Sequence, residues 1–130
     1  MTWIVPRRAC LALAALLLAG CGGSSLGKKA LQQEAKGLQS LAAEGSMLAG
    51  DASRGRSTVV FTRMHSRYLR ASARTSAATL SAGKTPEARR LAVLAVRLRD
   101  DLNRLSHSGS NAAEQRTLQH DLATIAAKSS

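Results

Sequence analysis

The sequence predicts an all-α fold, a small up-down-up-down four-helix bundle, on three observations. After residue 27, apolar residues recur at intervals of three and four, which is the period of an amphipathic helix. Glycine and proline are sparse there, and no alternating β-branched or aromatic run typical of a strand occurs. The apolar residues are mainly leucine and alanine, which suit closely packed helices. Because four helices joined by short turns must alternate in direction, they form an up-down-up-down bundle.

The first helix is predicted over residues 28–50. Its apolar residues share one face, whereas Gln33 and Glu44 point away from that face. The members of the apolar face are Leu31, Ala35, Leu38, Leu41, Ala42, Gly45, Leu48 and Ala49. Gly50 predicts the end of this helix, and Asp51 predicts the N-cap of the next one.

The second helix is predicted over residues 53–82 and has two opposite faces at about 100° per residue. We expect its aromatic face to be buried; this face carries Phe61, Met64, His65, Tyr68, Leu69, Ser72 and Ser76. The opposite face is a row of arginines, Arg56, Arg63, Arg67, Arg70 and Arg74. Residues 71–82 are mostly small, which predicts either a close approach of two helices or a groove. Close packing is favoured because cavities cost stability.

The third helix begins with three typical start signals: Thr85 as N-cap, Pro86 at the first position and Glu87 as an acid in the first turn. Residues 107–109 predict its end. Its core face consists of Leu91, Leu94, Ala95, Leu98, Leu102 and Leu105.

The fourth helix is predicted to begin at a capping box, in which Asn111 is followed three residues later by Glu114. We expect it to fray at residues 128–130. Its apolar face carries Leu118, Leu122 and Ile125.

The first 21 residues have the pattern of an export signal. Arg7 and Arg8 precede an apolar run over residues 9–19, and residues 18–21 read Leu-Ala-Gly-Cys. This pattern resembles the signal of bacterial lipoproteins, and the resemblance covers residues 1–21 only. It implies that residues 1–20 are cleaved and that Cys21 carries diacylglycerol and an acyl chain such as palmitate. The apolar run is too short for a retained membrane span, which needs about 20 residues.

The sequence therefore divides into a signal peptide (1–20), a lipidated cysteine with a flexible tether (21–27) and a helical bundle domain (28–130). The tether reaches at most about 20 Å, so the bundle stays close to the bilayer. Cys10 leaves with the signal, so we expect neither a disulfide nor a free thiol in the mature chain. The expected location is the outer face of the cytoplasmic membrane or the outer membrane, depending on the type of cell envelope.

The charge is strongly basic. Without Arg7 and Arg8, the 19 basic residues fall to 17 against 8 acidic ones, which leaves a net charge of +9. In an exported protein this excess favours an anionic lipid, an anionic envelope polymer or an acidic protein as partner. Nucleic acid is not expected, because of the export signal and the scarcity of aromatic residues. The arginine row has two interpretations that the sequence leaves open, a solvated outer face or a contact surface for anions.

No catalytic or metal-binding motif occurs. There is no Gly-x-Ser-x-Gly, no phosphate-binding glycine loop and no cysteine nucleophile in the mature chain. None of the four glutamates has the histidine three positions later that bundle metal sites use. We therefore expect a non-enzymatic protein without a cofactor other than the lipid on Cys21.

His65 lies on the face predicted to be buried. It is either a ligand or pH-sensing site, or a core histidine hydrogen-bonded to an acid such as Glu34, Asp101 or Asp121, and the second interpretation is favoured. The leading hypothesis is a lipid-anchored cell-envelope lipoprotein that serves as a binding or accessory module. The alternative is a small-molecule or metal-binding bundle that uses the space beside His65 and residues 71–82.

Overall fold

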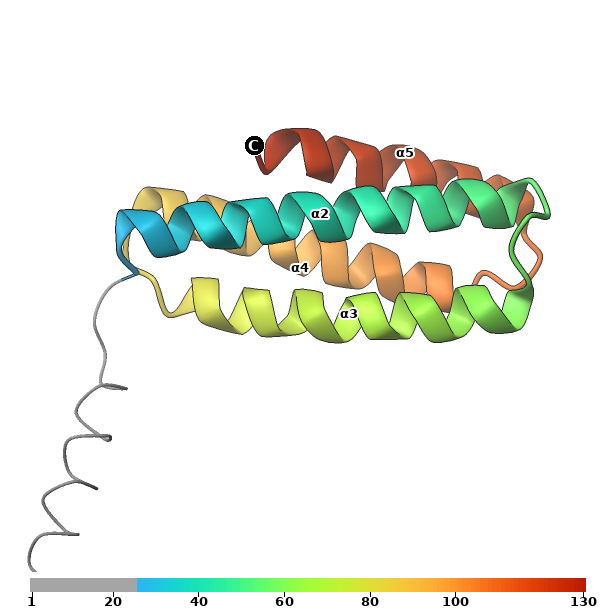
Figure 1. Ribbon diagram of the computed structural model, residues 1–130, viewed down its shortest axis with the longest axis horizontal. Coiled ribbons are helices and arrows are strands. Elements are labelled where there is room, and N and C mark those ends of the chain that lie inside the picture. The colour runs from blue at the N-terminus through green and yellow to red at the C-terminus, as the bar shows by residue number, and fades with distance from the viewer. Residues whose placement is uncertain (1–25) are drawn as a thin grey trace, which may run out of the picture.

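The computed structural model describes residues 26–130, and these residues form four α-helices and no strand. The helices are α2 (Lys28–Ser53), α3 (Val59–Ser81), α4 (Pro86–Ser106) and α5 (Ala112–Lys128). Consecutive helices run in opposite directions (Figure 1), so the predicted up-down-up-down bundle is confirmed. The predicted signal peptide and nearly all of the tether lie outside the described residues. Within residues 26–130, no helix is long and apolar enough to cross a membrane.

The helix starts follow their predicted caps, with one exception. The Thr85 hydroxyl accepts from the Ala88 N–H, and the Asn111 side chain accepts from the Glu114 N–H, both at 3.1 Å. The prediction that Asp51 caps the second helix is wrong, because Asp51 lies inside α2.

Helix α2 extends three residues beyond its predicted end. Gly50 is buried, and a β-carbon built there would meet the amide nitrogen of Gln119 of α5 at 2.7 Å. Helix packing therefore continues through the glycine that was expected to stop it. The chain reverses later, at Gly55 with a φ of 70°, and Thr58 caps α3 by accepting from the Phe61 N–H at 3.1 Å.

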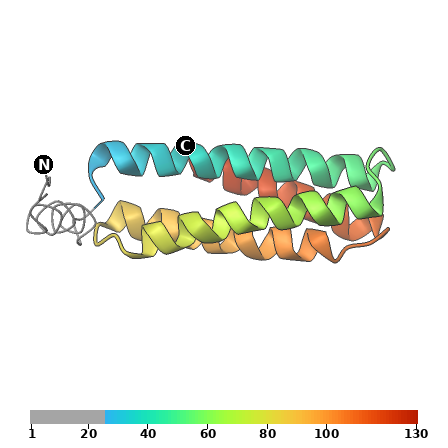
Figure 2. The same cartoon turned by 60° about the horizontal axis from the view of Figure 1, so that its bottom comes forward.

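The helices form two closely packed pairs, α3 with α4 and α2 with α5, which face each other across the core (Figure 2). The core contains leucines from every helix and small residues at the closest approaches. Its largest fully buried apolar side chains are Leu38, Leu69, Leu80, Leu91, Leu98, Leu102, Leu105, Leu118, Leu122 and Ile125. The core positions predicted for the first, third and fourth helices are therefore buried or half-buried.

The buried face predicted for α3 is wrong. Phe61, Met64 and Tyr68 are 55%, 65% and 67% exposed. The observed buried face is rotated by about 100° and consists of Thr62, Ser66, Leu69, Ala73, Ala77 and Leu80.

Packing explains this rotation. The small side chains of the observed face let the α3 backbone approach α4 closely, which rings on the same face would prevent. The Ser66 hydroxyl donates to the Thr62 carbonyl at 2.6 Å, so a polar residue is buried with its hydrogen bond made. Close packing through Ala73 and Ala77 confirms the favoured interpretation of the small-residue segment.

Candidate functional site

Helix α3 presents two different exposed surfaces because it lies at an edge of the bundle, between α2 and α4. One surface is apolar and borders α2; the other is a row of arginines and borders α4. The helix contains four arginines and no acidic residue.

The arginine row consists of Arg63, Arg67, Arg70 and Arg74. Arg63, Arg67 and Arg74 are exposed and pair with none of the acidic residues in the described part of the chain. Arg56, the fifth predicted member, lies in the turn over residues 54–58 rather than on the helix. The helix starts later than the sequence pattern indicated, so the row on α3 is shorter by one residue.

The arginine row continues onto α4 across a polar hollow of about 380 Å³. Arg70 and Arg74 line this hollow together with Arg99, Asp100 and Asn103. Arg70 donates to the Asn103 side-chain oxygen at 2.5 Å, and Arg99 pairs with Asp100 at 2.9 Å. Among the described residues, Arg70 and Arg74 therefore pair with no acidic side chain, whereas Arg99 does. The helical period of α3 alone does not reveal Arg99, because its position depends on how α4 packs.

The apolar surface, here called the aromatic–methionine patch, consists of Phe61, Met64 and Tyr68, which are 55%, 65% and 67% exposed. On the side of α2, Glu44 contacts His65, and Leu48 and Asp51 line a pocket together with Phe61. Val59 and Val60, at the start of α3, are exposed as well.

His65 is at the edge of this patch rather than in the core. Its side chain is 30% exposed, and its Nε2 donates to the Glu44 carboxylate at 2.7 Å. The imidazole stacks between Phe61 and Tyr68, with ring centroids 5.4 and 6.1 Å away. The prediction of a buried histidine is therefore wrong. Its partner is Glu44, a residue expected to point into solvent, and not Glu34, Asp101 or Asp121.

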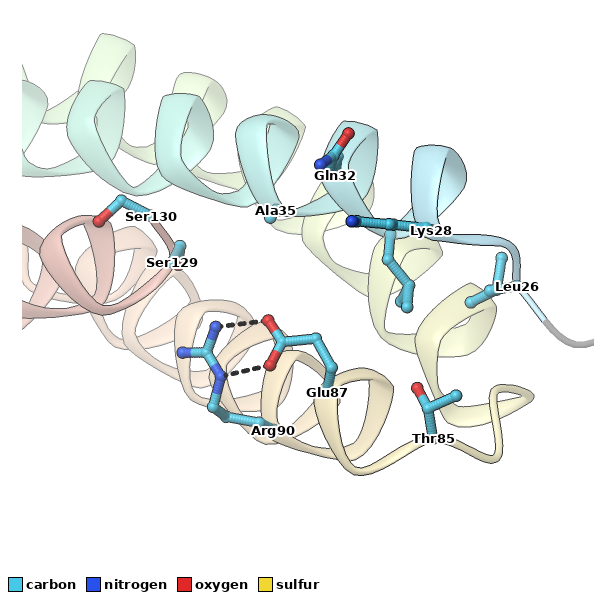
Figure 3. A pocket seen from close by; sticks show the side chains of 10 residues that line it. Leu26, Lys28, Gln32, Ala35, Thr85, Glu87, Arg90, Ser129 and Ser130 are labelled. Atoms are coloured by element: carbon cyan, nitrogen blue, oxygen red, sulfur yellow. Dashed lines mark hydrogen bonds and ion pairs between the residues drawn. The ribbon is translucent and has the colours of Figure 1, made fainter.

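A third feature is an apolar cleft of about 490 Å³ at the end of the bundle where α2 begins. Leu26, Leu31 and Ala35 are among its lining residues, and the end of α5 lies opposite Ala35 of α2 (Figure 3). The C-terminal part of its lining is provided by Ser129 and Ser130.

An ion pair fixes the rim of this cleft. Arg90 donates to both carboxylate oxygens of Glu87, at 2.7 and 3.1 Å (Figure 3). It also donates to the Lys128 carbonyl at 2.6 Å. The hydrogen bonds from Arg90 lower the pKa of the Glu87 carboxyl below its ordinary value. The arginine thereby ties the start of α4 to the end of α5.

The predicted lipidation site and two further histidines remain to be placed. Cys21 lies outside the described residues. His120 is exposed, and His107 ends α4, where its Nδ1 donates to the Asn103 carbonyl at 2.8 Å. Within residues 26–130, no group of three or more histidine, cysteine, aspartate or glutamate side chains is arranged to hold a metal ion.

No protein-family model, curated protein or solved structure matches the chain. The surfaces described above are therefore the only guide to the function.

Proposed function

We propose that the protein is a non-enzymatic, lipid-anchored cell-envelope lipoprotein whose bundle contacts an anionic surface through α3. The observation that carries this proposal is the arginine row, four cations on a helix without a single acid. The lipoprotein-like pattern of residues 18–21 supplies the anchor, with diacylglycerol and palmitate-type acylation on Cys21. The proposed location is outside the cytoplasm, at the membrane that holds the lipid.

Electrostatics makes a bilayer a suitable anionic surface. Each basic residue near an anionic membrane contributes about 1 kcal/mol, and screening limits this contribution to about 8 Å in physiological salt. The short tether keeps the bundle near this range. Like charges spaced along one helix face also repel each other, and a negatively charged surface removes that cost.

The anchor is tested by replacing Cys21 with alanine. Cells expressing the wild-type chain should incorporate a labelled fatty acid into the protein and retain it in the membrane fraction. Cys21→Ala should abolish both, whereas Cys10→Ala should leave both unchanged because Cys10 belongs to the signal. A wild-type chain without label would rule out the anchor.

The arginine row is tested with residues 22–130, which contain the whole core. We expect Arg63, Arg67 and Arg74 changed together to glutamine to weaken binding to phosphatidylglycerol vesicles by on the order of 100-fold at low salt. The matched control changes Arg89, Arg97 and Arg116, which are equally exposed but lie on other helices. Equal losses of vesicle binding in both variants would mean that net charge alone causes the effect. That result would contradict a special role of α3.

The apolar cleft favours a second candidate function, binding of a small apolar molecule. Leu31 and Ala35 are only half-buried there, and Lys28 supplies positive charge in the lining, whereas the charge of Arg90 is paired with Glu87. A long-chain fatty acid matches this combination. Ala35→Trp should fill the cleft and abolish any rise in melting temperature that the fatty acid causes. If wild-type protein shows no such rise, this candidate function is excluded.

A further inference from the structure

We propose that the aromatic–methionine patch inserts into the headgroup region of an anionic bilayer, so that the bundle is held at two points and lies along the membrane. This inference rests on the proposed lipid anchor and adds a second, non-covalent contact. The arginine row supplies charge beside the patch, while the patch itself supplies the apolar contact.

The exposed apolar residues are concentrated rather than scattered. Among residues 26–130, five of the eight large exposed hydrophobic side chains lie in the first ten residues of α3. The core does not need them, because the small residues of α3 already fill the contact with α4. A concentrated apolar surface with a charged border is typical of a binding face.

The chemistry of these side chains suits the membrane interface. Tyrosine and other amphipathic aromatic residues are enriched at the depth of the lipid headgroups. Methionine adapts its shape to an irregular surface, so Met64 can fit between lipid groups. Arginine side chains extend to the phosphates while their aliphatic parts stay in the apolar layer. On α3, Arg63 directly precedes Met64 and Arg67 directly precedes Tyr68, so both arginines border the patch.

The geometry separates the two attachment points. The start of α2, which follows the tether, lies at one end of the bundle, and the start of α3 lies at the other (Figure 1). From Lys28 to Ser53, α2 covers about 38 Å along its axis. An anchor at one end and an apolar patch at the other hold the long axis of the bundle parallel to the membrane.

A bilayer fits this face better than a second copy of the chain. A symmetric dimer through this face would bring two α3 helices together, each with four arginines and no acid. Two carboxylates border the patch, and both have partners: Glu44 is hydrogen-bonded to His65, and Asp51 pairs with Arg54. Anionic lipid complements this charge, whereas an identical protein surface repels it.

The experiment uses the full lipidated chain, reconstituted into vesicles of phosphatidylglycerol with brominated acyl chains. The lipidated chain begins at Cys21 and so lacks Trp3, the one tryptophan of the sequence; the indole introduced by Phe61→Trp is then the only one in the mature chain. The control is Val93→Trp, which introduces an equally exposed indole on α4, beside the end of α5. A second probe, Tyr68→Trp, guards against a local effect of the first substitution.

We expect the two patch indoles to shift to shorter emission wavelength and to be quenched about twofold more strongly than the control indole, since only the patch reaches the lipid. Equal quenching at the patch and at Val93 would overturn the inference. An emission shift without quenching by brominated lipid would mean that protein covers the patch, which also overturns it. Flotation of the vesicles distinguishes the two proposals: a chain that does not float with them contradicts the anchor itself.

Discussion

At the scale of single residues, two glycines of α2 have opposite roles. Gly45 is buried, and a β-carbon there would meet a Leu102 methyl at 2.9 Å and a Leu122 methyl at 3.3 Å. Gly37 is exposed, and nothing lies within 4 Å of a β-carbon at that position. The first glycine allows three helices to meet, whereas the second only weakens α2.

Replacing each glycine with alanine should therefore change stability in opposite directions. Gly37→Ala should raise the free energy of unfolding by about 0.5–1 kcal/mol, the usual helix-propensity gain. Gly45→Ala should lower it by about 1–2 kcal/mol, because the strain of overpacking exceeds that gain. Urea unfolding of residues 22–130 measures both changes. A stabilising Gly45→Ala would show that the core yields easily at this point.

Asp101 makes a pH-dependent contribution to stability. Its side chain is only 13% exposed, and burial, followed by the nearby Asp121 charge, raises the pKa of its carboxyl above the ordinary value. The folded state therefore holds the Asp101 proton more tightly than the unfolded state does. The stability that this carboxyl contributes is complete at low pH and is lost as the pH rises through its ordinary range and the raised pKa.

We accordingly expect Asp101→Asn to stabilise the bundle more at pH 7 than at pH 3. Asparagine keeps the neutral form of the side chain and removes the cost of burying the charge. The measurement compares the free energies of unfolding of the variant and the wild type at the two pH values. A difference that is constant with pH, or larger at pH 3, would contradict the raised pKa.

Local contacts of single residues could be predicted from the sequence, whereas contacts between helices could not. The caps at Thr85 and Asn111 could be predicted because a cap depends on neighbours within four residues. The partner of His65 could not, because Glu44 is 21 positions away and meets it only when α2 and α3 pack. Glu114 is an intermediate case: it follows the cap as predicted, but its carboxylate accepts from Arg104 at 2.7 Å.

At the scale of elements, α3 is the helix whose orientation the sequence did not predict. The other helices bury or half-bury their leucines, as the usual rule expects. In α3 the rule fails, because close approach to α4 favours small residues on the buried face. The arginine row was correctly predicted to lie on the outside of the bundle, because it points outward in both the predicted and the observed rotation of α3.

The small-residue contact of α3 can be tested by enlarging it. Ala73→Leu should lower the free energy of unfolding by about 2–3 kcal/mol, because Ala73 is fully buried against α4 and leaves no room for three more carbons. Ala71→Leu is the matched control on the exposed side of the same helix, and should change stability by less than about 0.5 kcal/mol. If both variants unfold alike, the rotation of α3 is not fixed by packing.

At the scale of the whole molecule, the fold was predictable and the candidate surfaces were only partly so. Helical period, caps and short turns are enough to define an up-down-up-down bundle. The aromatic–methionine patch borders α2 at the contact of His65 with Glu44, and the polar hollow combines α3 with α4. Such surfaces depend on tertiary packing, so the sequence predicted only the arginines of α3 as a surface and placed its aromatic face in the core.

Three elements combine into one proposed arrangement. A lipid on Cys21 would hold one end of the bundle, the patch would hold the other end, and the arginine row between them would face lipid phosphates. Each element has its own length scale, a tether of at most about 20 Å, a helix axis of about 38 Å for α2 and a screening distance of about 8 Å. All three support a bundle that lies against the membrane rather than extending away from it.

The central claim, lipid attachment at Cys21, is tested most directly by the intact mass of the protein extracted from its own membrane. We predict a chain that begins at Cys21 and carries the additional mass of diacylglycerol, with or without a further acyl chain on its amino group. Digestion should assign that mass to the fragment that contains Cys21. A chain that retains residues 1–20, or one that begins at Cys21 without added lipid mass, would contradict the claim.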